Sequence, residues 1–247
     1  MSSNQHFIRF NRFPLLYGRV PKVANTSIKA TLVRLLEQQP EQGRSTSDAF
    51  WVKNTHQETA LITPKEAREL RGTHFSFSFV RNPFDRLVSA YNNKILELDD
   101  VSGPMRTMGL RHKMPFREFL EIIVQTDDHQ LDVHLLPQSS ILCLDGQVIP
   151  SFVGQMEQMG HHWNALQHWL RRERLPQLGN LPEKNVRRGD DRSDLQGYFS
   201  DPTTVRLVEQ RYGEDIFLFY GGLSVSQLIS GDILPSSAPK TPLITLG

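Results

Sequence analysis

Two short segments place cationic and hydroxyl side chains where they could bind an anion. The first, Pro21-Lys-Val-Ala-Asn-Thr-Ser27, follows an apolar stretch and precedes a helical pattern that begins near Ile28. Exposed N–H groups and the positive end of the helix dipole favour anions at such a helix start. Lys22 stands just before it, and Asn25 or Thr26 is expected to cap it. We therefore expect an anion-binding loop; the alternative is an ordinary capped helix beside a surface lysine.

The second segment, Arg81-Asn-Pro-Phe-Asp-Arg-Leu-Val-Ser-Ala-Tyr91, follows an alternating aromatic run that predicts a buried strand. Asn82 is a good N-cap and Pro83 suits the first helical position, so a helix should start directly after the strand. Arg81 and Ser89 can then converge on one phosphate at the carboxyl edge of the sheet. The alternative is that Arg81 caps its own sheet and Ser89 is merely solvated. The presence of two such segments in one chain favours anion binding.

Strands that alternate with helices must position these segments. This pattern predicts an α/β fold with a mainly parallel central sheet flanked by helices. A single domain is expected over residues 1–222, followed by a poorly ordered tail at 223–247 that is rich in Ser and Pro. Thr63 and Glu66 predict a capping box at the start of one short helix. The expected strands are 13–20, 75–80, 141–144 and 148–153. The expected helices are 28–38, 63–71, 83–98, 116–124, 161–172 and 202–212. The expected loops are 40–60, 99–115, which should be mobile, and 180–197.

The composition is that of an ordinary water-soluble globular protein. The chain has 247 residues, of which 38% are hydrophobic and 22% charged, and its formal net charge of +1 argues against bulk nucleic-acid binding. The single cysteine, Cys143, excludes an internal disulfide and lies in an apolar run that indicates a core position. No stretch approaches the roughly 20 apolar residues that a spanning helix needs. We therefore expect a soluble, cytoplasmic protein without an integral membrane segment; its oligomeric state is not readable from the sequence.

Together the two segments resemble the cofactor motifs of sulfotransferases that use 3′-phosphoadenosine-5′-phosphosulfate (PAPS). Among these the chain is most similar to carbohydrate sulfotransferases of the chondroitin and dermatan type. The segment His134-Leu-Leu-Pro-Gln138, the segment Phe152-Val-Gly-Gln-Met-Glu157 and the aromatic stretch 212–220 also fit the family pattern. The resemblance covers roughly residues 14–221 and implies a P-loop-kinase-like fold. Members of this type are usually anchored Golgi proteins, and this chain shows no such anchor, which leaves the acceptor open.

The resemblance implies a function and a set of site residues. The implied activity is transfer of the sulfuryl group from PAPS to a hydroxyl acceptor, most simply a carbohydrate, with 3′,5′-adenosine bisphosphate as the nucleotide product. Arg81, and Ser89 eight residues later, would bind the 3′-phosphate. The first motif would surround the 5′-phosphosulfate with Lys22, Val23, Ala24, Asn25, Thr26 and Ser27.

Sulfuryl transfer needs a cation at the leaving oxygen and a base for the acceptor proton. Lys22 is the expected cation, because it sits at the loop where the 5′-phosphosulfate would lie. No metal is expected, because the protein can neutralise a leaving phosphate itself and no cluster has metal-ligand spacing. Histidine titrates in the range that suits a base. We rank His56 first, His134 second and His74 third, and a structural role stays open for each.

Two other functions remain as alternatives. A nucleotide kinase would share the fold class, but the chain lacks the motif G-x-x-x-x-G-K-[ST], and no Ser or Thr follows Lys22 directly to hold magnesium. A module that binds a nucleotide or an anionic glycan without catalysis would use the same basic loops. The presence of Lys22 together with Arg81 and Ser89 favours the enzyme.

Overall fold

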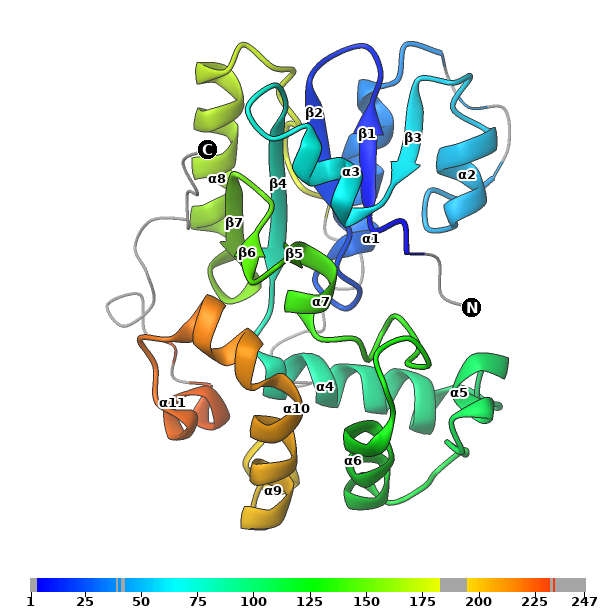
Figure 1. Cartoon of the computed structure of the whole chain (residues 1–247), viewed down its shortest axis with the longest axis vertical. Helices are drawn as coiled ribbons and strands as arrows, with labels where there is room; N and C mark the ends of the chain where they lie inside the picture. Colours follow the sequence, from blue (N-terminus) through cyan, green and yellow to red (C-terminus); the bar gives the residue numbers. More distant parts are fainter. Residues whose placement is uncertain (1–3, 39, 41–42, 183–194, 232, 234–247) are drawn as a thin grey trace. The chain divides into compact units, whose positions relative to one another are not determined.

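A computed structural model describes residues 4–38, 40, 43–182, 195–231 and 233 (Figure 1). Within these residues the chain forms two compact units. A sheet unit contains residues 4–80 and 141–182, and a helical unit contains residues 81–140, 195–231 and 233. Each unit is described by itself.

The sheet unit is built on five strands in the order β3-β1-β2-β4-β7. β1 is antiparallel to both of its neighbours, whereas β2 is parallel to β4 and β4 is parallel to β7. Four of the five strands therefore point in one direction, as their arrows in Figure 1 show, and the predicted mainly parallel sheet is confirmed. The strands are β1 (Phe7–Phe10), β2 (Leu15–Gly18), β3 (Thr59–Ile62), β4 (Phe75–Val80) and β7 (Phe152–Gln155).

Both faces of this sheet are covered. Successive residues of a strand point to opposite faces, and Leu15, Leu16 and Tyr17 of β2 are all buried, as are Phe7 and Ile8 of β1. Such strands are typical of α/β folds, in which helices flank the sheet. The other elements of the unit are α1 (Asn25–Leu32) with the 3₁₀ turn Val33–Leu35, α2 (Asp48–Lys53), α3 (Pro64–Glu69), the hairpin β5 (Cys143–Leu144) and β6 (Gln147–Val148), the 3₁₀ turn Met156–Gln158, and α8 (Met159–Arg172).

The helical unit packs α10 against α6 and α4. An aromatic cluster forms part of its core: Tyr91 of α4 contacts Phe116 and Phe119 of α6, and Phe84 meets Phe199 edge to face at 4.9 Å between ring centroids. The short helix α7 (Gln138–Leu142) spans the point where the chain passes back to the sheet unit. The helices of this unit are α4 (Pro83–Tyr91), which continues as the π-helical turn η2 (Asn92–Glu97), α5 (Gly103–Thr107), α6 (Phe116–Gln125), α9 (Leu195–Tyr198), α10 (Pro202–Tyr220) and α11 (Val225–Ser230).

Elements with strong local signals were predicted correctly. The strand at 75–80 is β4, and the helix that follows runs as far as Glu97. At the start of α3 the Thr63 hydroxyl accepts the Glu66 N–H, and the Glu66 carboxylate accepts the Thr63 N–H, which is the predicted capping box. The predicted helices at 116–124 and 161–172 correspond to α6 and α8.

Other expectations were wrong. β1 was not predicted, and the expected loop at 40–60 contains α2 and the start of β3. The expected loop at 99–115 contains α5, and its apolar residues Val101, Met105, Leu110 and Met114 are buried, so it packs against its unit.

Three helix assignments in the second half also differ from the expectation. Residues Gln138–Leu142 are helical where a strand was expected from 141, and α10 runs on to Tyr220 after a kink at Tyr212, where the expected helix ends. The expected tail at 223–247 contains the helix α11, and its residues 232 and 234–247 lie outside the described residues. Residues 183–194 of the expected loop at 180–197 also lie outside them.

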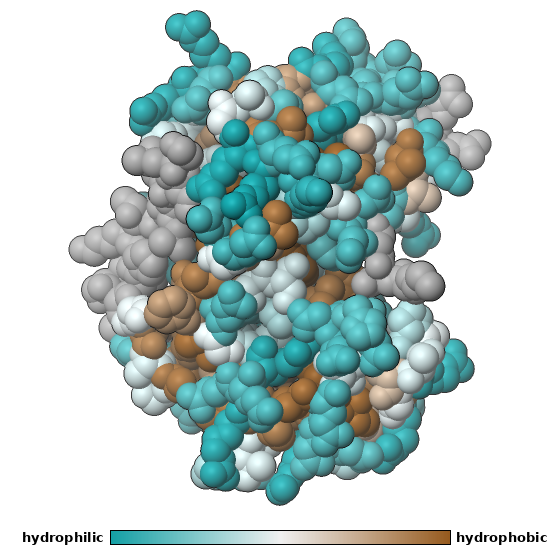
Figure 2. Space-filling model, in the orientation of Figure 1, coloured by the Kyte–Doolittle hydropathy of each residue, from teal (hydrophilic) through white to brown (hydrophobic). Residues whose placement is uncertain are grey.

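The surface in view is mostly hydrophilic, with smaller hydrophobic patches (Figure 2). Among the residues that the structure describes, the large hydrophobic side chains that are exposed are Val52, Leu98 and Phe217. No helix in this part of the chain has the length and apolar character needed to cross a membrane.

Candidate functional site

The loop between β2 and α1 has an unusual backbone. Lys22 (φ 66°) and Ala24 (φ 47°) both adopt left-handed conformations, which cost a non-glycine residue roughly 1 kcal/mol each. Ala24 is the N-cap of α1, so the N-cap residue supplies no side-chain acceptor for the first N–H groups of the helix. Left-handed turns and helix starts both aim backbone N–H groups into anion-binding concavities. The backbone therefore fits the predicted anion-binding loop.

The predicted cap at Asn25 or Thr26 was wrong. Asn25 is the first residue of α1, and its side-chain oxygen accepts a hydrogen bond of 3.0 Å from the Tyr17 hydroxyl in β2. The Asn25 side chain thus binds a residue of another element, Tyr17, and not the N–H groups at the start of its own helix. Thr26 lies in the first turn and is half-buried, while Ser27 is buried.

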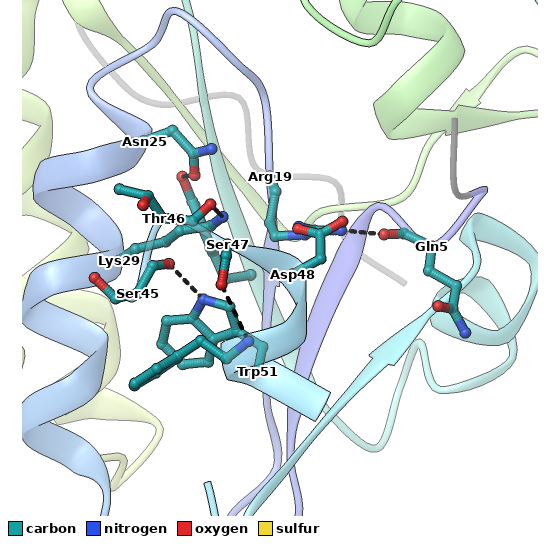
Figure 3. A network of polar contacts seen from close by, with 11 residues as sticks. Gln5, Arg19, Asn25, Lys29, Ser45, Thr46, Ser47, Asp48 and Trp51 are labelled. Atoms are coloured by element: carbon teal, nitrogen blue, oxygen red, sulfur yellow. Dashed lines mark hydrogen bonds and ion pairs between the residues drawn. The ribbon is translucent and has the colours of Figure 1, made fainter. Parts of the chain in front are cut away.

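A polar network connects the elements that flank this loop (Figure 3). Arg19, which directly follows β2, donates to the Asp48 carboxylate of α2 and to the Gln5 carbonyl. Lys29 of α1 donates to the Thr46 carbonyl at 3.2 Å, and the Trp51 indole N–H donates to the Ser45 carbonyl at 2.7 Å. These contacts tie the end of β2, the second turn of α1 and the segment before α2 together.

The basic residues in and beside this network are buried, and burial changes their titration. The Lys29 side chain is 3% exposed, and burial, with the nearby Arg19 charge, lowers its pKa to about 8 despite the opposing effect of Asp48. His6, whose carbonyl accepts the Arg19 N–H at 2.8 Å, is also buried. Burial and the Arg19 charge lower the pKa of His6 to about 4 against the opposing effect of Asp48.

The second segment has the predicted local structure. The Asn82 carboxamide accepts the Phe84 N–H at 3.1 Å and so caps α4, with Pro83 at the first helical position. Arg81 directly follows β4, and its Nε donates to the Asp85 carboxylate at 2.8 Å. Ser89 lies further along α4 and is 8% exposed. Since β2 and β4 are parallel neighbours, their last residues, Gly18 and Val80, lie at the same edge of the sheet.

Gln138 binds the backbone of Arg81 in both directions. Its side-chain oxygen accepts the Arg81 N–H and its amide donates to the Arg81 carbonyl, each at 2.9 Å. Gln138 is fully buried. This exchange joins the segment His134–Gln138 to the residue expected to bind the 3′-phosphate, which gives a physical reason for the Gln of the family-like pattern.

Buried groups from α4 and α10 hold the rest of that segment. Arg86 donates to the Leu136 carbonyl at 2.8 Å, and the Tyr212 hydroxyl donates to the Leu135 carbonyl at 2.7 Å. The Asp215 carboxylate accepts the N–H groups of Gln138 and Ser139 at 2.8 and 2.7 Å. Burial raises the pKa of Asp215, against the opposing effects of these N–H groups and of Arg86.

Sequence reasoning missed Asp215 and Arg86. One signal was present: Asp215 shares the buried face of α10 with Tyr212 and Phe219, and a carboxylate on an otherwise apolar helix face needs a polar partner. Its partners lie some 77 positions earlier in the chain, where no local pattern identifies them.

Two of the three candidate bases lie at the edge of the sheet opposite Lys22. His56 is exposed in the turn before β3, and the carbonyl of nearby Glu58 accepts the Asn11 N–H from the turn between β1 and β2. That turn is at the amino end of β2, whereas Lys22 lies beyond its carboxyl end. His74 immediately precedes β4 and is therefore also at the amino edge. The structure places His56 and His74 at the edge opposite Lys22, which does not favour the ranking that placed His56 first.

His134 lies in the helical unit, together with Arg81 and Ser89. Its ring Nδ1 is 2.7 Å from the Asp132 carboxylate, which also accepts the His134 backbone N–H at 2.9 Å. Among the residues that the structure places, no group of three or more His, Cys, Asp or Glu side chains could hold a metal ion. His134 stays a candidate for the base.

Comparisons with known proteins identify the family of this chain. The chain is 28% identical to carbohydrate sulfotransferase 14 of Mus musculus and of Homo sapiens over 183 residues, 68% of this chain and 47% of each relative. It is 26% identical to the Danio rerio protein of the same name over 200 residues, 74% of this chain and 52% of the relative. The chain therefore spans about half the length of these relatives. No solved structure matches it significantly. The model of the sulfotransferase family matches residues 5–221, and the chain belongs to that family.

Proposed function

We propose that this protein transfers the sulfuryl group of PAPS to a hydroxyl of a carbohydrate acceptor, without a metal ion. The observation that carries the proposal is the loop between β2 and α1, where left-handed Lys22 and Ala24 lead into a helix start. Membership of the sulfotransferase family and the similarity to carbohydrate sulfotransferases support it. In this proposal residues 1–222 work as one sulfotransferase domain.

The residues present fit a doubly phosphorylated nucleotide. Backbone N–H groups of Val23 to Ser27, with the hydroxyls of Thr26 and Ser27, would hold the 5′-phosphosulfate. Arg81 and Ser89 would hold the 3′-phosphate, because a guanidinium pairs with phosphate through two hydrogen bonds and a hydroxyl adds a third. When bound, PAPS supplies an activated sulfuryl group whose leaving group is a phosphate oxygen.

The protein's own side chains would do the remaining chemistry. The Lys22 ammonium would stabilise the negative charge that develops on the leaving oxygen, and this charge exists mainly in the transition state. His134 would accept the proton of the acceptor hydroxyl. Asp85, which accepts the hydrogen bond from Arg81 Nε, would hold the guanidinium ready for the 3′-phosphate.

A transfer assay tests the proposal. The full chain is incubated with radiolabelled PAPS and a panel of neutral and acidic polysaccharides, in the presence of a metal chelator. We expect label in a carbohydrate acceptor and release of 3′,5′-adenosine bisphosphate in equal amount. Transfer that needs added magnesium, or phosphate transfer from ATP, would favour the kinase alternative. Tight binding of 3′,5′-adenosine bisphosphate without any transfer would favour a binding module.

A further inference from the structure

The carboxylate of Asp132 binds both the backbone and the ring of His134. One carboxylate oxygen, Asp132 Oδ1, lies 2.9 Å from the His134 backbone nitrogen and 2.7 Å from the ring Nδ1. Because backbone and ring are bound to the same atom, the ring has little freedom to turn about its first side-chain torsion.

The turn that carries the pair is itself fixed. The Asp132 carbonyl accepts the N–H groups of Leu135 and Leu136 at 2.8 and 3.2 Å. The carbonyls of Leu135 and Leu136 are in turn held by Tyr212 and Arg86, as described above. The backbone around His134 is therefore bound on both sides.

Burial and charge distinguish the two partners. The Asp132 side chain is 11% exposed, whereas the His134 side chain is 32% exposed, so the carboxylate is covered and the ring reaches the surface. Burial alone would raise the pKa of Asp132. The hydrogen bonds and charge of His134 and the charge of Lys94 outweigh it, so the pKa lies below its ordinary value. Asp132 is thus an anion at neutral pH and can only accept hydrogen bonds.

An ionised acceptor decides the tautomer of the ring. Nδ1 must carry the proton that it shares with Asp132, so in the neutral ring Nε2 carries the lone pair. We propose that Asp132 is a positioning residue that holds His134 with Nε2 ready to accept a proton, and that stabilises the ring once it is charged. A buried carboxylate has this role in other enzymes whose base is histidine.

This inference rests on the proposed function. His134 Nε2 takes the acceptor's hydroxyl proton while the acceptor oxygen forms its bond to sulfur. The bond between sulfur and the leaving phosphate oxygen breaks at the same time, and its electron pair stays on that oxygen. The proton removed from the acceptor ends on His134, whose new positive charge lies beside the Asp132 carboxylate.

The test compares Asp132→Asn with Asp127→Asn, which removes the same charge from an exposed residue of the same segment. We expect Asp132→Asn to lower kcat about 100-fold or more, with KM for PAPS and acceptor changed less than about twofold. Asp127→Asn should retain the wild-type kcat. Nitrogen-15 NMR of histidine-labelled protein, assigned with His134→Ala, reports which ring nitrogen carries the proton. It should show the Nδ1–H tautomer in the wild type and a loss of that preference in Asp132→Asn.

Two results would overturn the inference. One is an active wild type in which Asp132→Asn keeps kcat within about twofold. The other is an Nε2–H tautomer at His134 in the wild type, which needs no variant and so does not depend on how a variant folds. If the wild type transfers no sulfate, the proposed function fails. The ring tautomer still tests the positioning role of Asp132 on its own. An Nδ1–H tautomer in the wild type that is lost in Asp132→Asn supports this role, and an Nε2–H tautomer in the wild type contradicts it.

Discussion

The buried ring of His6 should make the protein sensitive to mild acid. Its side chain is 5% exposed, and its pKa is lowered from 6.5 to about 4, chiefly by burial and then by the Arg19 charge. The unfolded chain binds a proton at His6 below about pH 6.5, whereas the folded chain does so only below about pH 4. Between these values the unfolded state holds more protons, so the free energy of unfolding falls as the pH falls.

The size of this loss follows from the shift. A shift of about 2.5 pKa units corresponds to ~3.4 kcal/mol when the whole window has been crossed. Between pH 7.5 and pH 5, where most unfolded chains but few folded ones are protonated at His6, the loss is ~2 kcal/mol. That is a large part of the stability of a typical domain.

Urea unfolding at pH 7.5 and pH 5 measures the loss. His6→Gln removes the titrating group, and His129→Gln, at an exposed position, is the matched control. The wild type and His129→Gln should each lose ~2 kcal/mol more than His6→Gln on going to pH 5. An equal loss in all three proteins would refute the argument that His6 is held neutral by burial.

Three further predictions concern the loop, the clamp on Arg81 and the buried lysine. Lys22→Ala and Lys22→Gly should both lower kcat about 100-fold or more with little change in PAPS affinity. Lys22→Gly should be ~1 kcal/mol more stable than Lys22→Ala, because φ at this position is 66°. Equal stability of the two variants would contradict the backbone strain inferred at Lys22. Gln138→Leu should lose ~2–4 kcal/mol of stability and most of the preference for a 3′-phosphate, because both hydrogen bonds to the Arg81 backbone disappear, whereas Gln130→Leu, at an exposed position, should change neither. The pKa of Lys29 is lowered from 10.5 to about 8, so between these values the unfolded chain binds more protons than the folded chain. The free energy of unfolding of the wild type should therefore rise by ~3 kcal/mol relative to that of Lys29→Met as the pH rises across this window. If the free energies of unfolding of the two proteins changed equally with pH, the prediction would be contradicted.

Local signals in the sequence were sufficient for part of the fold. Asn82 and Pro83 identified the start of α4, and Thr63 with Glu66 identified the start of α3, since capping groups lie within a few residues of the N–H groups they bind. The same rule failed at α1, where the Tyr17 hydroxyl occupies the Asn25 side chain and Ala24 becomes the N-cap. A local rule holds only where no distant partner competes for the same group.

The arrangement of the candidate site could be predicted only in part. The residue types and spacing of the Lys22 loop and of Arg81 with Ser89 identified both segments. The edge of the sheet at which His56 lies depends on β1 and β3, and neither strand was predicted, so its rank could not be judged. Gln138 and Asp215 act on partners 57 and 77 positions away, and such pairings become visible only in the folded chain.

Calorimetric titration with 3′,5′-adenosine bisphosphate, in the presence of a chelator and with 5′-AMP as the comparison ligand, tests the central claim most directly. Two charge-assisted hydrogen bonds from Arg81 to the 3′-phosphate should contribute ~3 kcal/mol, so the bisphosphate should bind about 100-fold more tightly than 5′-AMP. Arg81→Ala should bind the two nucleotides almost equally. Equal binding by the wild type, or an unchanged preference in Arg81→Ala, would contradict the proposed nucleotide site.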